Sequence, residues 1–344
     1  DFRKQTGNFT FNTIYGEESN TFDPNDLGFN SVNNKRIFNQ RFSYRIFKPF
    51  WKLNRLSTSI DFIYNRLYSP NAYTSTNVNW SLFVNSKRFH AAGLNVTSSI
   101  TKSYDFFEPR AWRAYFVRPK YASTSAWISS NYQKRFAIDA NIRWDIIDNP
   151  DWIDWGYSIS PRVRISNKIF LVYEWEHSFS TDSQGYAVAF GVPAETSESI
   201  VFGNRNRTNV INTININYTI TSLMGITFKL RHYRSHIRYN YFYDLQEDGT
   251  LIRNQLTGLD INNESAYNTN FNAFTIDFVY RWVFRPGSEL SLVWKNSIFT
   301  NDKRVSETYL QNLGSTFENN ALNSISIKLL YWIDYQDIKK LFKK

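Results

Sequence analysis

The sequence predicts an all-β protein, namely a transmembrane, antiparallel up-and-down β-barrel of fourteen strands of the outer-membrane type. Three observations carry this prediction. Apolar and polar residues alternate along most of the chain, the alternating segments are long, and short and long connections follow one another between them. Alternation with a period of two places the two residue sets on opposite faces of a strand. A barrel wall with lipid outside and a polar lumen inside needs this arrangement.

The alternation is clearest in residues 136–147. The even-numbered positions from Phe136 to Ile146 are apolar, whereas the odd-numbered positions from Ala137 to Asp145 include charged residues. The clearest segments run for about 12 to 16 residues, whereas strands of soluble proteins average about 5 or 6 and a membrane-crossing strand needs about 9 to 11. Aromatic residues such as Tyr64, Trp155 and Tyr280 lie near the ends of the apolar stripes, as in the girdles of membrane barrels.

The expected strands follow this pattern in chain order. Segment 8–16 is short, and serines blur the two faces of segment 120–131. The fourteen strands are expected at 8–16, 35–47, 52–66, 75–86, 89–102, 120–131, 134–147, 154–165, 168–180, 206–220, 225–244, 267–284, 288–300 and 318–332.

Six short and seven long connections join these strands, so both termini fall on the short-turn side, as in barrels with short periplasmic turns. The short connections lie at 48–51, 86–88, 133–134, 166–167, 221–224 and 285–288. The long, polar loops lie at 17–34, 67–74, 103–120, 148–153, 181–205, 245–266 and 301–317.

The chain is expected to form one barrel domain over residues 1–335, followed by a basic tail over 336–344. Within the loop 245–266, residues 239–245 are expected to fold back as 250–255 about the turn 247–249. A helical last turn is expected near 337–342. A soluble sandwich, solenoid or propeller is the rival architecture, but no period of 20–50 residues recurs and the apolar stripes would be left in water.

Charged residues in the middle of the strands lie opposite the apolar stripe and are expected to line the lumen. Both signs occur on neighbouring strands, which leaves two interpretations open: a polar pore or binding channel, or a network of cross-strand ion pairs that fills and stiffens the barrel. The predicted lumen-lining residues are Asp139, Arg143, Asp145, Arg162, Arg164, Glu174, Glu176, Lys229, Arg231, Asp277, Arg281, Glu289, Lys295 and Lys328.

Several other functions are disfavoured by composition. The absence of cysteine excludes disulfides, thiolate metal sites and cysteine nucleophiles, and no apolar run approaches the ~18 residues of a membrane-spanning helix. The net charge of +10 is dispersed through strands and turns, so nucleic acid is not an expected partner. Attraction to anionic lipid headgroups and lipopolysaccharide phosphates of the outer membrane is expected instead.

No catalytic residue, metal site or cofactor is predicted. His232 and His236 are spread over about 13 Å of a strand, too far apart for one metal ion. A hydrolase would need His177, His232 or His236 near a carboxylate such as Asp182 or Asp244, and nothing in the spacing singles one of them out. The acidic clusters 17–26 and 246–249 are expected to be solvated turns, with Ca²⁺ binding as the alternative.

Four short segments resemble a known family: Asn-Asp-Leu-Gly-Phe at 25–29, Tyr-Asp-Phe-Phe-Glu-Pro-Arg at 104–110, Tyr-Gln-Lys-Arg-Phe at 132–136, and the run 286–296 that begins Pro-Gly-Ser-Glu-Leu. Together they resemble the C-terminal barrel region of a Bacteroidota family, domain of unknown function 5916. The resemblance implies that a carbohydrate-binding-like sandwich and a signal peptide precede Asp1. It carries over no catalytic residues.

The predicted function is that of a channel or transporter in the outer membrane of a Gram-negative bacterium, for uptake or surface handling of a solute, with a glycan-derived solute suggested by the family's upstream module. The alternative is a non-conducting anchor or accessory subunit of a larger assembly with other outer-membrane or periplasmic proteins. A histidine-based hydrolase is the third hypothesis.

Overall fold

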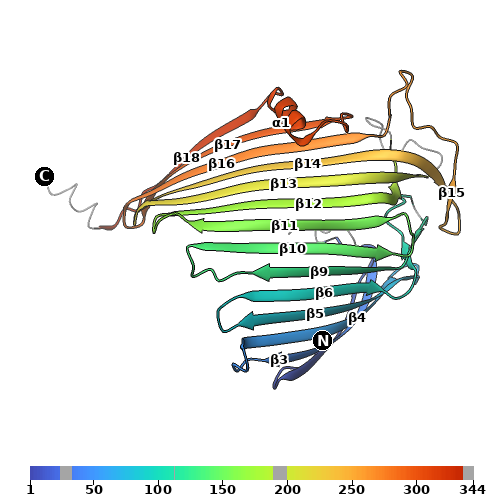
Figure 1. Cartoon of the computed structure of the whole chain (residues 1–344), viewed down its shortest axis with the longest axis horizontal. Coiled ribbons are helices and arrows are strands. Elements are labelled where there is room, and N and C mark those ends of the chain that lie inside the picture. The colour runs from blue at the N-terminus through green and yellow to red at the C-terminus, as the bar shows by residue number, and fades with distance from the viewer. Residues whose placement is uncertain (24–32, 112, 189–199, 336–344) are drawn as a thin grey trace.

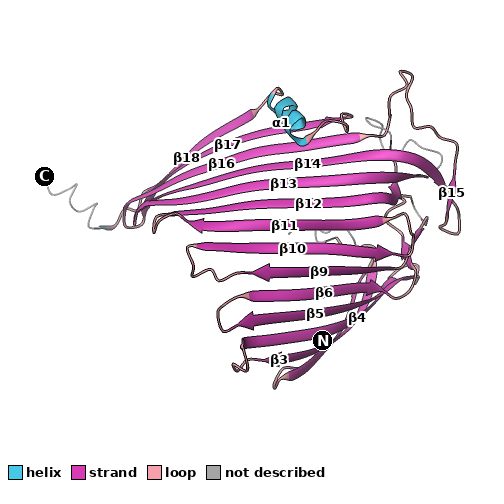
Figure 2. Ribbon diagram, viewed as in Figure 1, coloured by secondary structure: helices cyan, strands magenta, loops and turns pink. Residues whose placement is uncertain are grey.

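The structure is a computed structural model that describes residues 1–23, 33–111, 113–188 and 200–335. The expected basic tail and helical last turn lie outside these residues. Within them, the chain is built almost entirely of β-strands, with one short helix (Figure 2). None of the described helices is long and apolar enough to cross a membrane.

One large antiparallel sheet contains all the long strands, and each expected strand corresponds to one of them within a few residues, apart from longer extensions in β12 and β13. In sheet order they are β2 (Phe9–Glu18), β3 (Lys35–Ile46), β4 (Leu53–Leu67), β5 (Tyr73–Ser86), β6 (Ala91–Ser99), β9 (Tyr121–Ser129), β10 (Phe136–Ile147), β11 (Ile153–Arg164), β12 (Ile169–Tyr186), β13 (Val201–Thr221), β14 (Met224–Leu245), β16 (Thr269–Arg285), β17 (Ser288–Asp302) and β18 (Leu322–Leu330).

Short strands add to this sheet. β1 (Phe2–Lys4) pairs with the outer edge of β2, and β15 (Leu251–Arg253) pairs with the end of β14. The second pairing is the expected fold-back, with Tyr243 opposite Arg253. Among the described residues, no strand pairs with the outer edge of β18, so the sheet has two ends and closure into a barrel is not seen.

Figure 1 shows the short turns at one end of the strands and the long connections at the other. The sheet is curved, and β3 and β4 turn away behind the strands that follow them. The pairing register gives the sheet two chemically different faces. We call the side that carries Asp139 the polar face and the side that carries Ile142 the apolar face.

Burial differs between the two faces. Asp61 and Ala137 on the polar face are 4% and 3% exposed, whereas Ile142 and Ile325 on the apolar face are 53% and 71% exposed. Side chains crowd one another on the inside of a curved sheet and spread apart on its outside. The sheet therefore curves around its polar face.

The helix α1 (Tyr309–Phe317) covers part of the apolar face, in a stretch that the sequence predicted only as a loop. Thr308 caps its first turn through a reciprocal capping box with Gln311. The ring of Phe317 packs 4.8 Å from that of Phe274 on β16. The Tyr309 hydroxyl lies 2.7 Å from Nδ1 of the buried His232.

Polar residues of β13, β14 and β16 are hydrogen-bonded beneath this helix. Asn212 donates to the Tyr309 hydroxyl at 2.8 Å, and Arg234 donates to Asn270 at 3.0 Å and to the carbonyl of Glu307 at 3.0 Å. Since buried polar groups are costly when unpaired, these contacts explain why polar side chains are tolerated on the otherwise apolar face.

Candidate functional site

The fourteen predicted lumen-lining residues all lie on the polar face. The register shows this directly: Asp139 pairs with Ser160, Ser158 with Glu176, Thr213 with Arg231, and Asp277 with Lys295, and residues in step with these share their side of the sheet. The period-two pattern was sufficient to place them because strand pairing preserves the face of each residue. The residues Asp139, Arg143, Asp145, Arg162, Arg164, Glu174, Glu176, Lys229, Arg231, Asp277, Arg281, Glu289, Lys295 and Lys328 thus form one charged surface that runs from β10 to β18.

Eight of these residues form ion pairs with one another. The distances are 2.8 Å for Arg162–Asp139, 3.8 Å for Arg143–Asp145 and 3.6 Å for Lys295–Asp277, and Arg281 contacts Glu289. The others have no ion-pair partner among the described residues: Arg164, Glu174, Glu176, Lys229, Arg231 and Lys328. Ion pairs therefore account for one set of these side chains, whereas the pore or binding-channel interpretation of the second set stays a prediction.

A polar cluster centred on Asp139 lies toward the short-turn end. Asp139 accepts hydrogen bonds from Tyr132 at 2.6 and 2.7 Å, from Ser129 at 2.7 Å and from Arg162 at 2.8 Å. The Arg162 guanidinium also lies 4.7 Å from the centroid of the Tyr132 ring. Tyr132 is thereby held in place by a hydrogen bond at its tip and a cation–π contact on its face.

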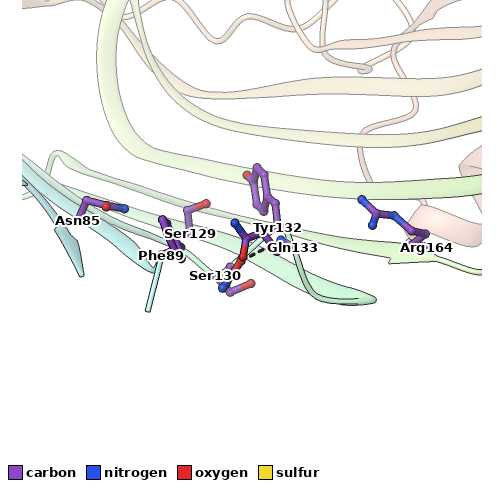
Figure 3. Close-up of a pocket in the computed structure, with 8 residues that line it drawn as sticks. Asn85, Phe89, Ser129, Ser130, Tyr132, Gln133 and Arg164 are labelled. Atoms are coloured by element: carbon purple, nitrogen blue, oxygen red, sulfur yellow. Dashed lines mark hydrogen bonds between the residues drawn. The ribbon is translucent and has the colours of Figure 1, made fainter. Parts of the chain in front are cut away.

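A cavity of about 550 Å³ adjoins this cluster (Figure 3). Asn85 and Ser129 line one side, Arg164 lies at the other, and Tyr132 and Phe89 present aromatic rings. Arg164 belongs to the unpaired set. Aromatic rings beside amides and a free guanidinium suit a ligand that has apolar faces, hydroxyl groups or a negative charge.

Among the described residues, no hydrogen bond or ion pair joins His177, His232 or His236 to Asp182 or Asp244. His232 and His236 lie on the apolar face, Asp182 interacts with Asn206 and Asn240, and Asp244 accepts from Asn254. The part of the chain that the structure describes has no group of three or more potential metal ligands.

The two acidic clusters are engaged within the protein in their described parts. Glu17 and Glu18 form ion pairs with Arg36 and Lys35 on β3, at 3.1 and 3.2 Å. Asp248 accepts hydrogen bonds from the backbone and hydroxyl of Thr250. These contacts favour solvated turns and strand ends over Ca²⁺ sites.

Sequence reasoning missed the role of residues 103–118, which it treated as a plain external loop. The segment contains a hairpin of β7 (Ser103–Asp105) and β8 (Phe116–Arg118), which pair with each other. Its ends join β6 and β9, yet its middle contacts β12 and β13, past the ends of β10 and β11. We call residues 103–118 the crossing segment.

Glu108 attaches the crossing segment to the distant strands. Its carboxylate accepts the amide hydrogen of Tyr186 at 3.0 Å and lies 3.7 Å from Arg205 and 3.5 Å from Arg118. Phe116 packs with its ring centroid 4.9 Å from that of Phe202, and both rings are buried. The segment is therefore fixed by an ionic contact and a hydrophobic contact at the long-loop end.

Asp105 orders the start of this segment. Burial by itself disfavours the charged carboxylate, but amide hydrogen bonds from Glu108 and Phe107 and the guanidinium of Arg118 outweigh burial and lower the pKa of Asp105 below 3.8. The carboxylate is charged at neutral pH and closes the turn that presents Glu108. The sequence shows the acidic and basic residues of this segment but not their partners, which lie up to 97 residues along the chain.

Comparison with known proteins gives one match. No curated protein and no solved structure matches the chain. A family model described as a domain of unknown function (DUF5916) matches residues 1–342, in agreement with the resemblance drawn from the four short motifs. The chain therefore belongs to the family of the domain of unknown function 5916.

Proposed function

We propose that this protein is an outer-membrane β-barrel that conducts a solute along its polar face. One observation carries the proposal: fourteen long strands pair in one antiparallel sheet, and outside the area beneath α1 its two faces keep opposite polarity from strand to strand. In the membrane, β18 would pair with the β1–β2 edge and close the barrel. Eight strands leave a lumen filled by side chains and sixteen leave an aqueous channel, so fourteen is compatible with a passage.

Lipid contact is supported by the apolar face. A soluble protein rarely leaves a continuous apolar surface open to water, yet Ile142, Trp144 and Ile325 are each at least half exposed here. Outer-membrane lipid and lipopolysaccharide would cover this face in a Gram-negative cell of the Bacteroidota. Closing the barrel would also pair the backbone N–H and C=O groups on the outer side of β18, which otherwise form an open sheet edge.

The solute class is suggested by the cavity at the short-turn end. Phe89 and Tyr132 offer ring faces, Asn85 and Gln133 offer amides, and Arg164 offers a positive charge. Sugars present apolar ring faces and hydroxyl groups to partners of this kind, which supports a glycan-derived solute. Neither a cofactor nor a catalytic residue is part of the proposal.

Conductance across planar bilayers tests the proposed channel. The purified protein is expected to produce discrete current steps, and ion-tight bilayers at every applied voltage would refute the proposal. The variant Glu174→Gln/Glu176→Gln removes two unpaired acids from the polar face and is expected to shift the reversal potential toward anion selectivity. Glu247→Gln, in an external turn, is the matched control and should leave selectivity unchanged.

A non-conducting anchor within a larger assembly is the second candidate. The crossing segment favours it, because a segment held across the long-loop end would restrict passage while leaving the loops available to other outer-membrane or periplasmic subunits. Extraction in mild detergent should then recover the protein with constant partners, whereas recovery of a lone barrel would contradict this candidate.

A further inference from the structure

The short connections of the sheet carry charge of one sign only. Between the strands they join, they contain seven basic residues and no acidic residue. The long connections contain both signs, with acidic residues such as Asp105, Asp148 and Asp260 among them. The basic residues of the short connections are Lys48, Lys52, Lys87, Arg88, Lys134, Arg135 and Lys168. We call this set the basic rim.

Most of the basic rim is free of internal partners. Arg135 and Lys168 donate to backbone carbonyls of neighbouring turns. In contrast, the charged groups of Lys48, Lys87, Arg88 and Lys134 make no ion pair or hydrogen bond with any described residue, and all four residues are exposed. Their charges are therefore available to an external anion.

Exposed aromatic rings accompany these cations. Trp51 is 76% exposed in the β3–β4 turn, and Lys52 lies 5.5 Å from its ring centroid. Phe47 is also more than half exposed, beside Lys48. Large rings next to cations are typical of the boundary between lipid chains and headgroups, where the rings enter the interface and the cations meet phosphates.

We propose that the basic rim binds anionic phospholipid headgroups of the leaflet on the short-turn side. The inference rests on the proposed membrane barrel. The residues of the basic rim are distributed over four turns from β3 to β12, so they would extend along more than half of a barrel's edge and not form one compact patch. A lipid leaflet meets every turn at once, whereas an acidic protein would engage a single patch. Lipid is therefore the better fit.

Spin-labelled lipids test this directly. The intact protein is reconstituted into phosphatidylcholine vesicles, and electron paramagnetic resonance measures the motionally restricted fraction of labelled phosphatidylglycerol and of labelled phosphatidylcholine. We expect at least a twofold preference for phosphatidylglycerol, decreasing with added salt. The variant Lys87→Gln/Lys134→Gln should reduce that preference, because two unpaired cations are removed from two turns.

Lys102→Gln/Lys120→Gln is the matched control, with the same two exchanges in a long connection, and it should keep the preference of the unaltered protein. Equal restriction of the two lipids around an inserted protein would overturn the proposal and would be the expected outcome if the rim served an acidic protein. Loss of preference in the control variant alone would also overturn it. Failure to insert into the vesicles would refute the barrel itself, and protease protection of the strands reports insertion separately.

Discussion

Replacing Glu108 by glutamine should release the crossing segment from β12 and β13. The exchange keeps an oxygen that can accept the Tyr186 amide hydrogen, so the shape and this hydrogen bond are preserved. It removes the charge that faces Arg205 at 3.7 Å and Arg118 at 3.5 Å. The side chains of Glu108 and Arg205 are 26% and 18% exposed, so solvent screens these pairs only in part.

The expected size of the effect follows from these contacts. A solvent-exposed ion pair contributes about 0.2–1 kcal/mol, and the partly buried Arg205 loses its carboxylate partner in addition. We therefore expect the attached state to lose about 1–2 kcal/mol, which raises the population of the released segment about 5–30-fold.

Limited proteolysis measures this population, because Arg110 and Arg113 offer trypsin sites within the segment. The cleavage rate there should rise about 5–30-fold when cleavage is slower than reattachment. Glu247→Gln is the control, since it makes the same exchange in an exposed turn where no ion pair of Glu247 is described. An unchanged cleavage rate in Glu108→Gln, or an equal increase in the control, would refute the assigned role of Glu108.

Three further predictions concern the elements around the sheet. Tyr309→Phe removes the hydroxyl shared by the buried His232 and by Asn212, and should lower the free energy of unfolding by about 1–3 kcal/mol, read from denaturant titration. Gly249→Ala should loosen the crossing segment, because Gly249 has φ +77° and a Cβ there would lie 2.6 Å from the Tyr115 ring. In contrast, a Cβ at Gly314 in α1 would meet nothing within 4 Å, so Gly314→Ala should raise the free energy of unfolding by about 0.5–1 kcal/mol. Acid should also loosen the segment: the pKa of Asp105 is lowered on folding, so its contribution is complete above 3.8 and is lost as pH falls below that value. Hydrogen exchange of the Glu108 amide, corrected for its intrinsic pH dependence, should show this loss in the unaltered protein and not in Asp105→Asn.

Strands were predicted well because alternation is a local property. In β10, Phe136 and Ile138 lie on one face of the sheet and Ala137 lies on the other, and each residue shares its face with the residue that it pairs with on β11. The charged surface of the polar face could therefore be predicted from spacing alone. Which of its members form ion pairs could not, because Arg162 reaches Asp139 whereas Glu174 reaches no cation among the described residues.

The elements that were missed depend on contacts between distant segments. The capping box of Thr308 and Gln311 was readable as a helix start, but the nine-residue helix is held by Phe274 and His232 on strands earlier in the chain. Glu108 finds its partners on β12 and β13, and no local pattern indicates this. The predicted closure into a barrel would likewise depend on contact between the first and last strands, which the described residues do not show.

At the long-loop end, neighbouring strands extend to different lengths. Tyr233 on β14 pairs with Ala273 on β16. Toward the long-loop end, β14 continues from Tyr233 for twelve residues to Leu245, whereas β16 extends from Ala273 for only four residues to Thr269. At about 3.4 Å per residue, β14 extends about 27 Å beyond the end of β16. In the proposed barrel, the rim at this end would be high along β14 and low along β16 and β17, so a solute would reach the lumen from the side of the shorter strands.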